Sequence, residues 1–290
     1  MNVGPVAWSI RDRVLSTADH TLVMGVVNAT PDSFSDGGRF AAAEDAVAHG
    51  FSLWAQGADI VDVGGESTRP GAEPVSADEE ISRVVPVVSE LVERGVVVSI
   101  DTTKPLVAEA AIAARAHIVN DVTALSDPDM AVVCADAGVG VVLMHMQGDP
   151  KTMQIDPRYK NVVAEVAGFL EERAGLALGV GIGRDRICID PGIGFGKTQD
   201  HNLALLDNID QLTATGYPVM IGTSRKGLLG AILRDAGVET SADERDTATA
   251  ATVALAVAGG ASVVRVHNVG HALQSARIAD AIVRVSQRRL

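Results

Sequence analysis

Acidic and amide side chains recur in this sequence directly after short runs rich in Val and Ile. Asp101, Asn120 and Asp190 each end such a run, and Arg265 and His267 stand two residues apart, on one face of a strand. Carboxylate and amide oxygens accept hydrogen bonds from a flat heterocycle with amino and ring N–H donors, whereas a guanidinium and an imidazole bind anionic oxygens. The set predicts a site for a heterocycle beside an oxyanion or phosphate.

Two further residues extend this predicted site. Lys226 follows another apolar run and is able to donate to a ring carbonyl, and Asn28 offers an amide oxygen to a hard cation such as Mg²⁺. A lone Asn here more often bonds the next loop, and a lone Asp more often caps a helix. However, the strand ends also carry Arg, Lys and His, which capping does not require.

The elements that must position these residues alternate between apolar runs and helix-period segments. The runs are 22–27, 59–63, 96–100, 117–119, 141–145, 186–189, 218–221 and 262–266, with helical patterns such as 41–56, 77–94 and 161–178 between them. Continuous apolar strands are covered on both faces, and about 250 residues is usual for a barrel of eight β/α units. The sequence therefore predicts an α/β fold: one (β/α)₈ TIM-barrel domain over 1–290, with 1–20 as a short N-terminal extension and 21–290 as the barrel.

An open, doubly wound sheet is the alternative fold. It would be favoured by a Gly-X-Gly-X-X-Gly pattern after the first strand, but residues 28–38 read NATPDSFSDGG. The connections at 28–40 and 64–75 exceed the two to six residues usual between a strand and a helix, and loops of that length are commonly lids.

Composition excludes several classes of protein. The chain of 290 residues has 24 Lys and Arg against 37 Asp and Glu, a formal net charge of −13, which argues against a general nucleic-acid binder. No apolar run approaches the ~20 residues that span a bilayer, and the first residues lack a secretion-signal pattern. Cys134 and Cys188 stand among apolar neighbours, which indicates neither disulfides nor a thiolate metal site. We expect a cytoplasmic protein that binds small molecules, not nucleic acid or membrane.

One helical segment, 247–258 (TATAATVALAVA), is apolar or small on nearly every face. Such a helix must be buried on more than one side. Either it packs between two neighbours within the chain or it forms a subunit interface, and we expect a homodimer on this ground.

Seven sequence blocks resemble the dihydropteroate synthase family, in the family's order. They are MGVVNATPDSFSDGG (24–38), DVGGESTRPG (62–71), SIDT (99–102), Asn120-Asp121, DPGIGFGK (190–197), GTSRK (222–226) and RVH (265–267). The resemblance implies a transferase of folate biosynthesis, inhibited by sulfonamides, with Mg²⁺ as cofactor. It would condense 6-hydroxymethyl-7,8-dihydropterin diphosphate with 4-aminobenzoate, giving 7,8-dihydropteroate and diphosphate by an ionising displacement.

The resemblance also implies a role for each matching residue. Asp101, Asn120, Met144, Asp190 and Lys226 would hold the pterin, with Arg265 stacked on it. Asn28, Arg265 and His267 would hold the diphosphate, with Asn28 also a ligand of Mg²⁺. Phe34, Asp36, Thr68, Arg69, Pro70, Phe195, Ser224 and Lys226 would surround 4-aminobenzoate. The catalytic set would be Asp101, Asp190, Lys226, Arg265 and His267.

Two other functions remain as alternatives. A pterin-binding methyltransferase domain would share the acidic residues that bind the pterin. However, it has no use for a diphosphate site or for the polar loop residues at 28–38 and 66–71. A catalytically silent paralogue would lack an Asp, Lys or His at one strand end, and none is missing.

Overall fold

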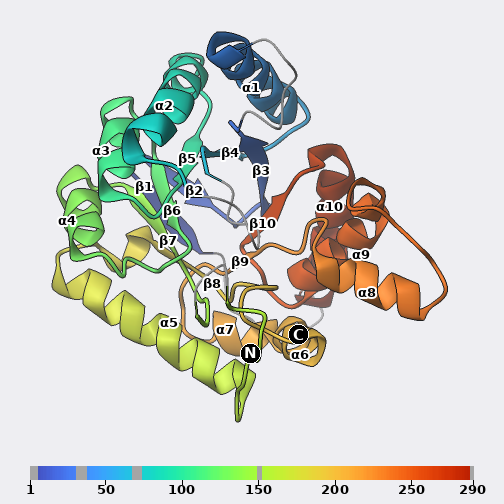
Figure 1. The fold of residues 1–290 in the computed structure, drawn as a ribbon. Coiled ribbons are helices and arrows are strands. Elements are labelled where there is room, and N and C mark those ends of the chain that lie inside the picture. Colours follow the sequence, from blue (N-terminus) through green and yellow to red (C-terminus); the bar gives the residue numbers. More distant parts are fainter. Residues whose placement is uncertain (1–5, 31–37, 67–73, 149–151, 288–290) are drawn as a thin grey trace.

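Eight parallel strands form one sheet that curls into a nearly closed barrel (Figure 1). The computed structural model describes residues 6–30, 38–66, 74–148 and 152–287. The barrel strands are β3 (Leu22–Asn28), β4 (Ile60–Gly64), β5 (Val98–Asp101), β6 (Ile118–Asp121), β7 (Gly140–Met144), β8 (Ile187–Asp190), β9 (Met220–Ile221) and β10 (Val263–Val266). Their spatial order is β8-β7-β6-β5-β4-β3-β10-β9, and a parallel bridge between Ile189 and Val219 joins the outer two. Each predicted run overlaps one strand, so the barrel is confirmed and the open doubly wound sheet is wrong.

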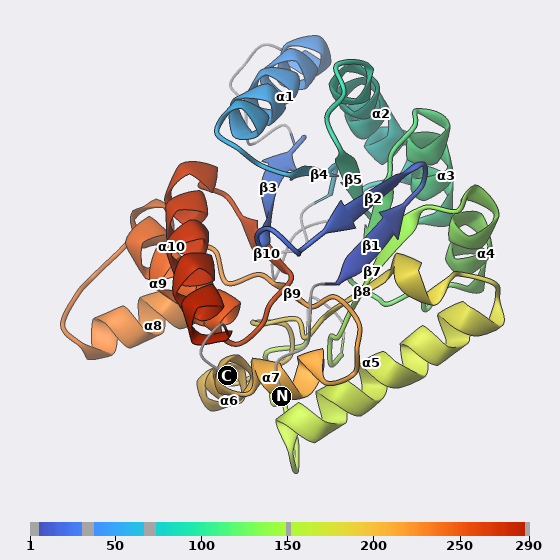
Figure 2. The same cartoon turned by 180° about the vertical axis from the view of Figure 1, so that it is seen from behind.

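Helices cover the outside of the barrel on all sides (Figures 1 and 2). They are α1 (Gly38–Ala55), α2 (Ala77–Glu93), α3 (Pro105–Ala113), α4 (Pro128–Ala137), α5 (Val162–Gly179), α6 (Gln199–Asp207), α7 (Ile209–Thr213), α8 (Gly227–Asp235), α9 (Asp246–Ala258) and α10 (Val269–Gln287). Local sequence sets their ends: Ser76 caps α2 by accepting from the Glu79 N–H at 3.2 Å, and Gly138 ends α4 in the left-handed conformation. Within the described ranges, none of the helices is long and apolar enough to cross a membrane.

The N-terminal extension closes one end of the barrel. Its strands β1 (Ala7–Ile10) and β2 (Arg13–Ser16) form an antiparallel hairpin that lies across the amino ends of the barrel strands (Figure 2). Trp8 and Ile10 are buried there in a cluster with inward-facing residues of the barrel, and the Trp8 indole donates to the Arg186 carbonyl at 2.9 Å. A Cβ on Gly140 would come within 2.6 Å of the Ile10 side chain, so hairpin and barrel are in close contact.

The inward-facing side chains change character along the barrel axis. Ile60 and Ile118 belong to the apolar cluster at the closed end, whereas Asp62 and Asn120, two residues further along the same strands, are buried and polar. The closed end is therefore an apolar floor, and the polar side chains gather towards the carboxyl ends. Cys134 and Cys188 are both buried free thiols.

The hairpin should contribute to stability without touching the polar end. We expect Ile10→Ala to lower the free energy of unfolding by about 2–5 kcal/mol, because it leaves a cavity in a fully buried site. Val14→Ala, on the same hairpin at a residue that is 64% exposed, should change it by less than about 0.5 kcal/mol. Urea denaturation followed by circular dichroism measures both. Equal values for the two variants would contradict the proposed role of the hairpin.

Candidate active site at the carboxyl ends of the strands

Arg265 is the centre of a charged cluster that joins the ends of four strands. Its Nε donates to Asp62 Oδ2 and its Nη2 donates to Asp101 Oδ2, both at 2.7 Å. The Asn120 side chain donates to the same Asp62 oxygen at 3.1 Å. Contacts between side chains thus tie β10 to β4 and β5, and β4 to β6. Asp101, Asn120 and Arg265, predicted as pterin residues, lie together as expected.

Asp62 is a residue of this cluster that sequence reasoning missed. It lies between Val61 and Val63 in an apolar run, and its side chain is fully buried. An acid inside such a run was the available signal, since a buried carboxylate needs partners. Its Oδ1, like Ser99 Oγ on the facing position of β5, is buried without a hydrogen-bond partner among the described residues.

Burial and charge together determine the ionisation of this cluster. Burial raises the pKa of Asp101 to about 7, against the lowering effect of Arg265 and with a further rise from Asp62. Burial alone would lower the pKa of Arg265, but Asp62 and Asp101 outweigh it and raise that pKa. The guanidinium therefore stays charged, while Asp101 is poised to gain or lose a proton near neutral pH.

Asp190 and Lys226 form the opposite side of the same mouth. Asp190, at the end of β8, is buried and accepts from the Gly192 N–H at 2.7 Å. Burial raises the pKa of Asp190 and lowers that of Lys226 to about 8, and each charge partly offsets the shift of the other. The Lys226 ammonium donates to the Ile193 carbonyl and lies 4.7 Å from the centre of the Phe195 ring. An acceptor, a cation and an aromatic face thus meet at one place.

Four other predicted residues lie at strand ends or in the turn after β9. The His267 N–H donates to Ser224 Oγ at 3.1 Å, and His267 Nδ1 lies 3.0 Å from the same oxygen. Met144 ends β7 and is the cross-strand partner of Asp190. Asn28 ends β3, opposite Gly64 of β4. Each stands at the carboxyl end of the barrel, the end at which chemistry occurs in such folds.

Lys197 and His145 support the loop after β8, and neither is among the predicted site residues. The buried Lys197 ammonium donates to the carbonyls of Gly192 and Phe195 at 3.0 and 2.9 Å, and lies 2.9 Å from His145 Nδ1. Burial lowers the pKa of Lys197 to about 7 and that of His145 to about 3, so this imidazole is a neutral acceptor. Gly192 has φ +65°, and a Cβ there would meet the His145 carbonyl oxygen. The contacts with Lys197 and His145 therefore fix the position of this loop.

The remaining predicted residues belong to the two long loops. Phe34, Asp36, Thr68, Arg69 and Pro70 lie outside the described residues, so their contact with 4-aminobenzoate stays a prediction.

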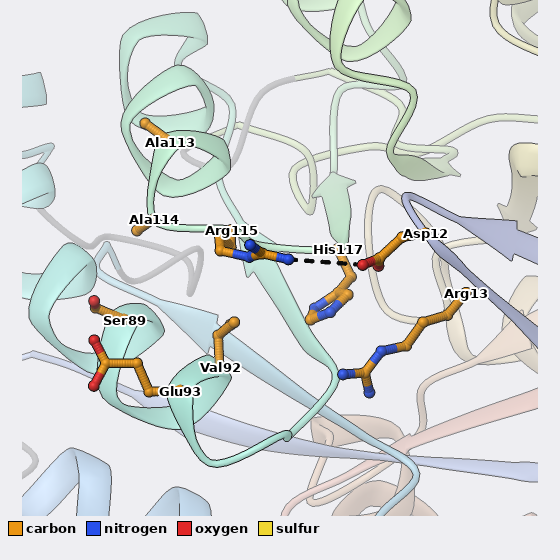
Figure 3. Close-up of a pocket in the computed structure, with 9 residues that line it drawn as sticks. All are labelled: Asp12, Arg13, Ser89, Val92, Glu93, Ala113, Ala114, Arg115 and His117. Atoms are coloured by element: carbon orange, nitrogen blue, oxygen red, sulfur yellow. Dashed lines mark ion pairs between the residues drawn. The ribbon is translucent and has the colours of Figure 1, made fainter.

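A cavity of about 390 Å³ lies at the other end of the barrel (Figure 3). His117 and Arg13 point into it, near the ion pair between Arg115 and Asp12. These groups already have structural partners: His117 Nδ1 accepts from the Val98 N–H at 3.2 Å, and Arg13 donates to the Gly95 carbonyl at 3.1 Å. This cavity contains none of the predicted site residues.

Comparison with known proteins gives one consistent result. A family model described as pterin binding enzyme matches residues 24–267. The dihydropteroate synthase of Neisseria meningitidis serogroup C is 48% identical over 255 residues, 87% of this chain and 89% of that protein. The structure of the Xanthomonas albilineans dihydropteroate synthase with 4-aminobenzoic acid has a TM-score of 0.88 at 44% identity, covering 96% of this chain and 98% of that one. Its complex with 7,8-dihydropteroate has a TM-score of 0.84 at 42% identity, covering 95% and 98%.

These matches confirm the family expected from the seven sequence blocks. Since the family model and the relatives each cover most of the chain, the chain belongs to the dihydropteroate synthase family of pterin-binding enzymes.

Proposed function

We propose that this protein is a transferase that condenses 6-hydroxymethyl-7,8-dihydropterin diphosphate with 4-aminobenzoate, giving 7,8-dihydropteroate and diphosphate. The observation that carries this function is the mouth of the barrel, where Asp101, Asn120 and Asp190 offer acceptors beside the cations Arg265 and Lys226. Membership of the dihydropteroate synthase family supports the same reaction.

The acceptors suit the pterin ring. Its amino group and ring N–H donate, so they match the carboxylates of Asp101 and Asp190, and the Asn120 amide can both donate and accept. Lys226 is able to move from the Ile193 carbonyl to a ring carbonyl, and the Arg265 guanidinium is planar and suited to stacking on a flat ring. Met144, buried beside Asp190, would provide apolar contact with the ring.

Diphosphate and Mg²⁺ fit the rim formed by Asn28, Arg265 and His267. No group of three or more His, Cys, Asp or Glu side chains that could hold a metal occurs in the described part of the chain. Mg²⁺ does not need one, because it is commonly bound by one or two protein oxygens together with substrate phosphates. Asn28 would supply that protein oxygen. Arg265 and His267 would donate to the phosphate oxygens.

The chemistry follows an ionising pathway. The bond between the pterin methylene carbon and the diphosphate oxygen breaks first, and its electron pair leaves with diphosphate. Arg265 and His267 stabilise the charge on the leaving group, and bound Mg²⁺ would neutralise more of it. Asp101 and Asp190 stabilise the cation left on the pterin. The neutral arylamine nitrogen of 4-aminobenzoate then attacks that carbon, and the arylammonium that forms is acidic enough to release its proton to solvent or to the departing diphosphate. No dedicated base is therefore needed. Phe195, Ser224 and the predicted loop residues would hold 4-aminobenzoate beside Lys226.

A diphosphate-release assay tests this function. We expect release that depends on 4-aminobenzoate and Mg²⁺. Asp190→Asn should lower kcat about 100-fold at unchanged stability, because an amide donor facing a pterin donor costs about 3 kcal/mol. Asp235→Asn, at the exposed end of α8, is the control. A methyltransferase or a silent paralogue would release no diphosphate, and a wild-type rate in Asp190→Asn would remove Asp190 from the pterin site.

The pH dependence of kcat/KM should be bell-shaped. Asp101 accepts from the pterin as a carboxylate, and since its pKa is about 7, binding should weaken as the pH falls below that value. Lys226 must be protonated to donate, and since its pKa is about 8, activity should fall as the pH rises above it. Calorimetry with a dihydropterin that carries no phosphate is the control, because diphosphate itself titrates near pH ~6. If binding of this dihydropterin does not weaken as the pH falls below about 7, Asp101 is not the titrating group.

We further propose that the protein forms a homodimer through the outer faces of α9 and α10. These helices pack side by side (Figure 2). Leu255 of α9 is 67% exposed, and Ile278, Ile282 and Val285 of α10 are also exposed. The part of the chain that the structure describes therefore leaves one face of α9 uncovered, which favours the interface over burial within the chain. A cytoplasmic location stays a prediction from the sequence.

Light scattering at micromolar concentration should give twice the mass of the chain. Leu255→Glu should shift the protein towards monomer, because it places a charge in an apolar interface. Leu106→Glu changes a leucine that is 61% exposed on α3, a helix on another side of the barrel (Figure 1), and should leave the mass unchanged. A wild-type monomer, or the same mass for both variants, would contradict this interface.

A further inference from the structure

The turn between β9 and α8 holds an unusual backbone conformation beside the proposed site. Ser224 and Lys226 both point towards the site from this turn, and Arg225 between them has φ +60°. A residue other than Gly is uncommon in this left-handed region, and the conformation persists only where its surroundings hold it. The direction of Lys226 and the contact of Ser224 with His267 therefore depend on what holds Arg225.

One row of side chains on α9 holds this turn. Asp246 accepts from Arg225 at two atoms, Nε at 2.9 Å and Nη2 at 3.2 Å. Thr249 Oγ1 accepts from the Arg225 N–H at 3.2 Å, and Thr252 Oγ1 lies 2.7 Å from Thr223 Oγ1. Positions spaced by three lie along one side of a helix, so the start of α9 supports the whole turn.

The same Asp246 carboxylate also holds the segment after β10. Its Oδ2 accepts from the Asn268 side chain at 2.8 Å, and Asn268 directly follows His267. Asp246 is largely buried, and hydrogen bonds from Arg225 and Asn268 outweigh burial and keep its pKa below the usual value. It therefore stays an anion that joins two segments far apart in the sequence.

We propose that Asp246 is a positioning residue for the transferase reaction: through Arg225 it orients Ser224 and Lys226, and through Asn268 it orients His267. This inference rests on the function proposed above. Asp246 itself would touch neither substrate. Its effect is to align the group that binds diphosphate with the groups that bind the pterin and 4-aminobenzoate, which come from different strand ends.

The test compares two aspartates that bind the same guanidinium. Asp243 accepts from Arg225 Nη1 at 2.6 Å, but its side chain is 84% exposed. We expect Asp246→Asn to lower kcat/KM by about tenfold or more, since small displacements of positioned groups are costly. Asp243→Asn should stay within about twofold, because an exposed ion pair contributes little.

A third variant separates positioning from a merely structural role. Asn268 also caps α10 by accepting from the His271 N–H at 3.2 Å. Asn268→Ser keeps an oxygen for that cap, but its side chain is one bond too short to bring a donor to Asp246 Oδ2. It should weaken binding of inorganic diphosphate with Mg²⁺, measured by calorimetry, and raise KM for 4-aminobenzoate less than Asp246→Asn does. Asp246→Asn should change both quantities, and the double variant should bind diphosphate no more weakly than Asp246→Asn alone.

Each outcome bears on the proposal. Equal kcat/KM for Asp246→Asn and Asp243→Asn would overturn it, as would unchanged diphosphate binding in Asn268→Ser. If Asp246→Asn does not fold, the result for Asn268→Ser decides alone. The wild-type diphosphate-release assay tests the proposed function separately, so failure of that function is seen before any variant is compared.

Discussion

The ion pair between Arg265 and Asp62 is the interaction on which the open end of the barrel depends. Asp62 is fully buried and Arg265 is mostly buried, so neither charge would be tolerated without the other. Asp101 accepts a further hydrogen bond from Arg265, and Asn120 donates one to Asp62. The groups that would meet the pterin are therefore held in place by strands on several sides of the barrel, before any substrate arrives.

This pair also accounts for the ionisation of the mouth. Two carboxylates share one guanidinium in a buried place. Burial, together with the charge of Asp62, raises the pKa of Asp101 there, although Arg265 opposes the rise. Below this layer the barrel is apolar and closed by the hairpin, which separates the polar mouth from solvent at the opposite end.

A second set of polar side chains holds the segments that carry the proposed substrate-binding residues. Lys197 holds the loop after β8 by its carbonyl oxygens, and Asp246 holds the segments after β9 and β10. Both act through residues that carry or flank the proposed substrate contacts. The strand end sets the position of a side chain along the barrel axis, whereas these supporting contacts set the direction in which the side chain points. That direction decides whether groups from separate strands can act on one substrate.

The sequence by itself determined the strands, their order of alternation with helices, and the polar residues at their carboxyl ends. These are local properties, because apolar periodicity marks an element and parallel strands bring their carboxyl ends to one edge. The sequence alone could therefore place Asp101, Asn120, Asp190 and Arg265 together.

Only the tertiary structure decided which charges are paired. Asp62 and Arg265 are 203 residues apart, and Asp62 reads as one acid in an apolar strand until the barrel brings β10 beside β3 and its neighbour β4. The contacts of Lys197 with His145 and of Asp246 with Asn268 are of the same kind, because a pairing between distant side chains depends on closure of the fold and leaves no local pattern.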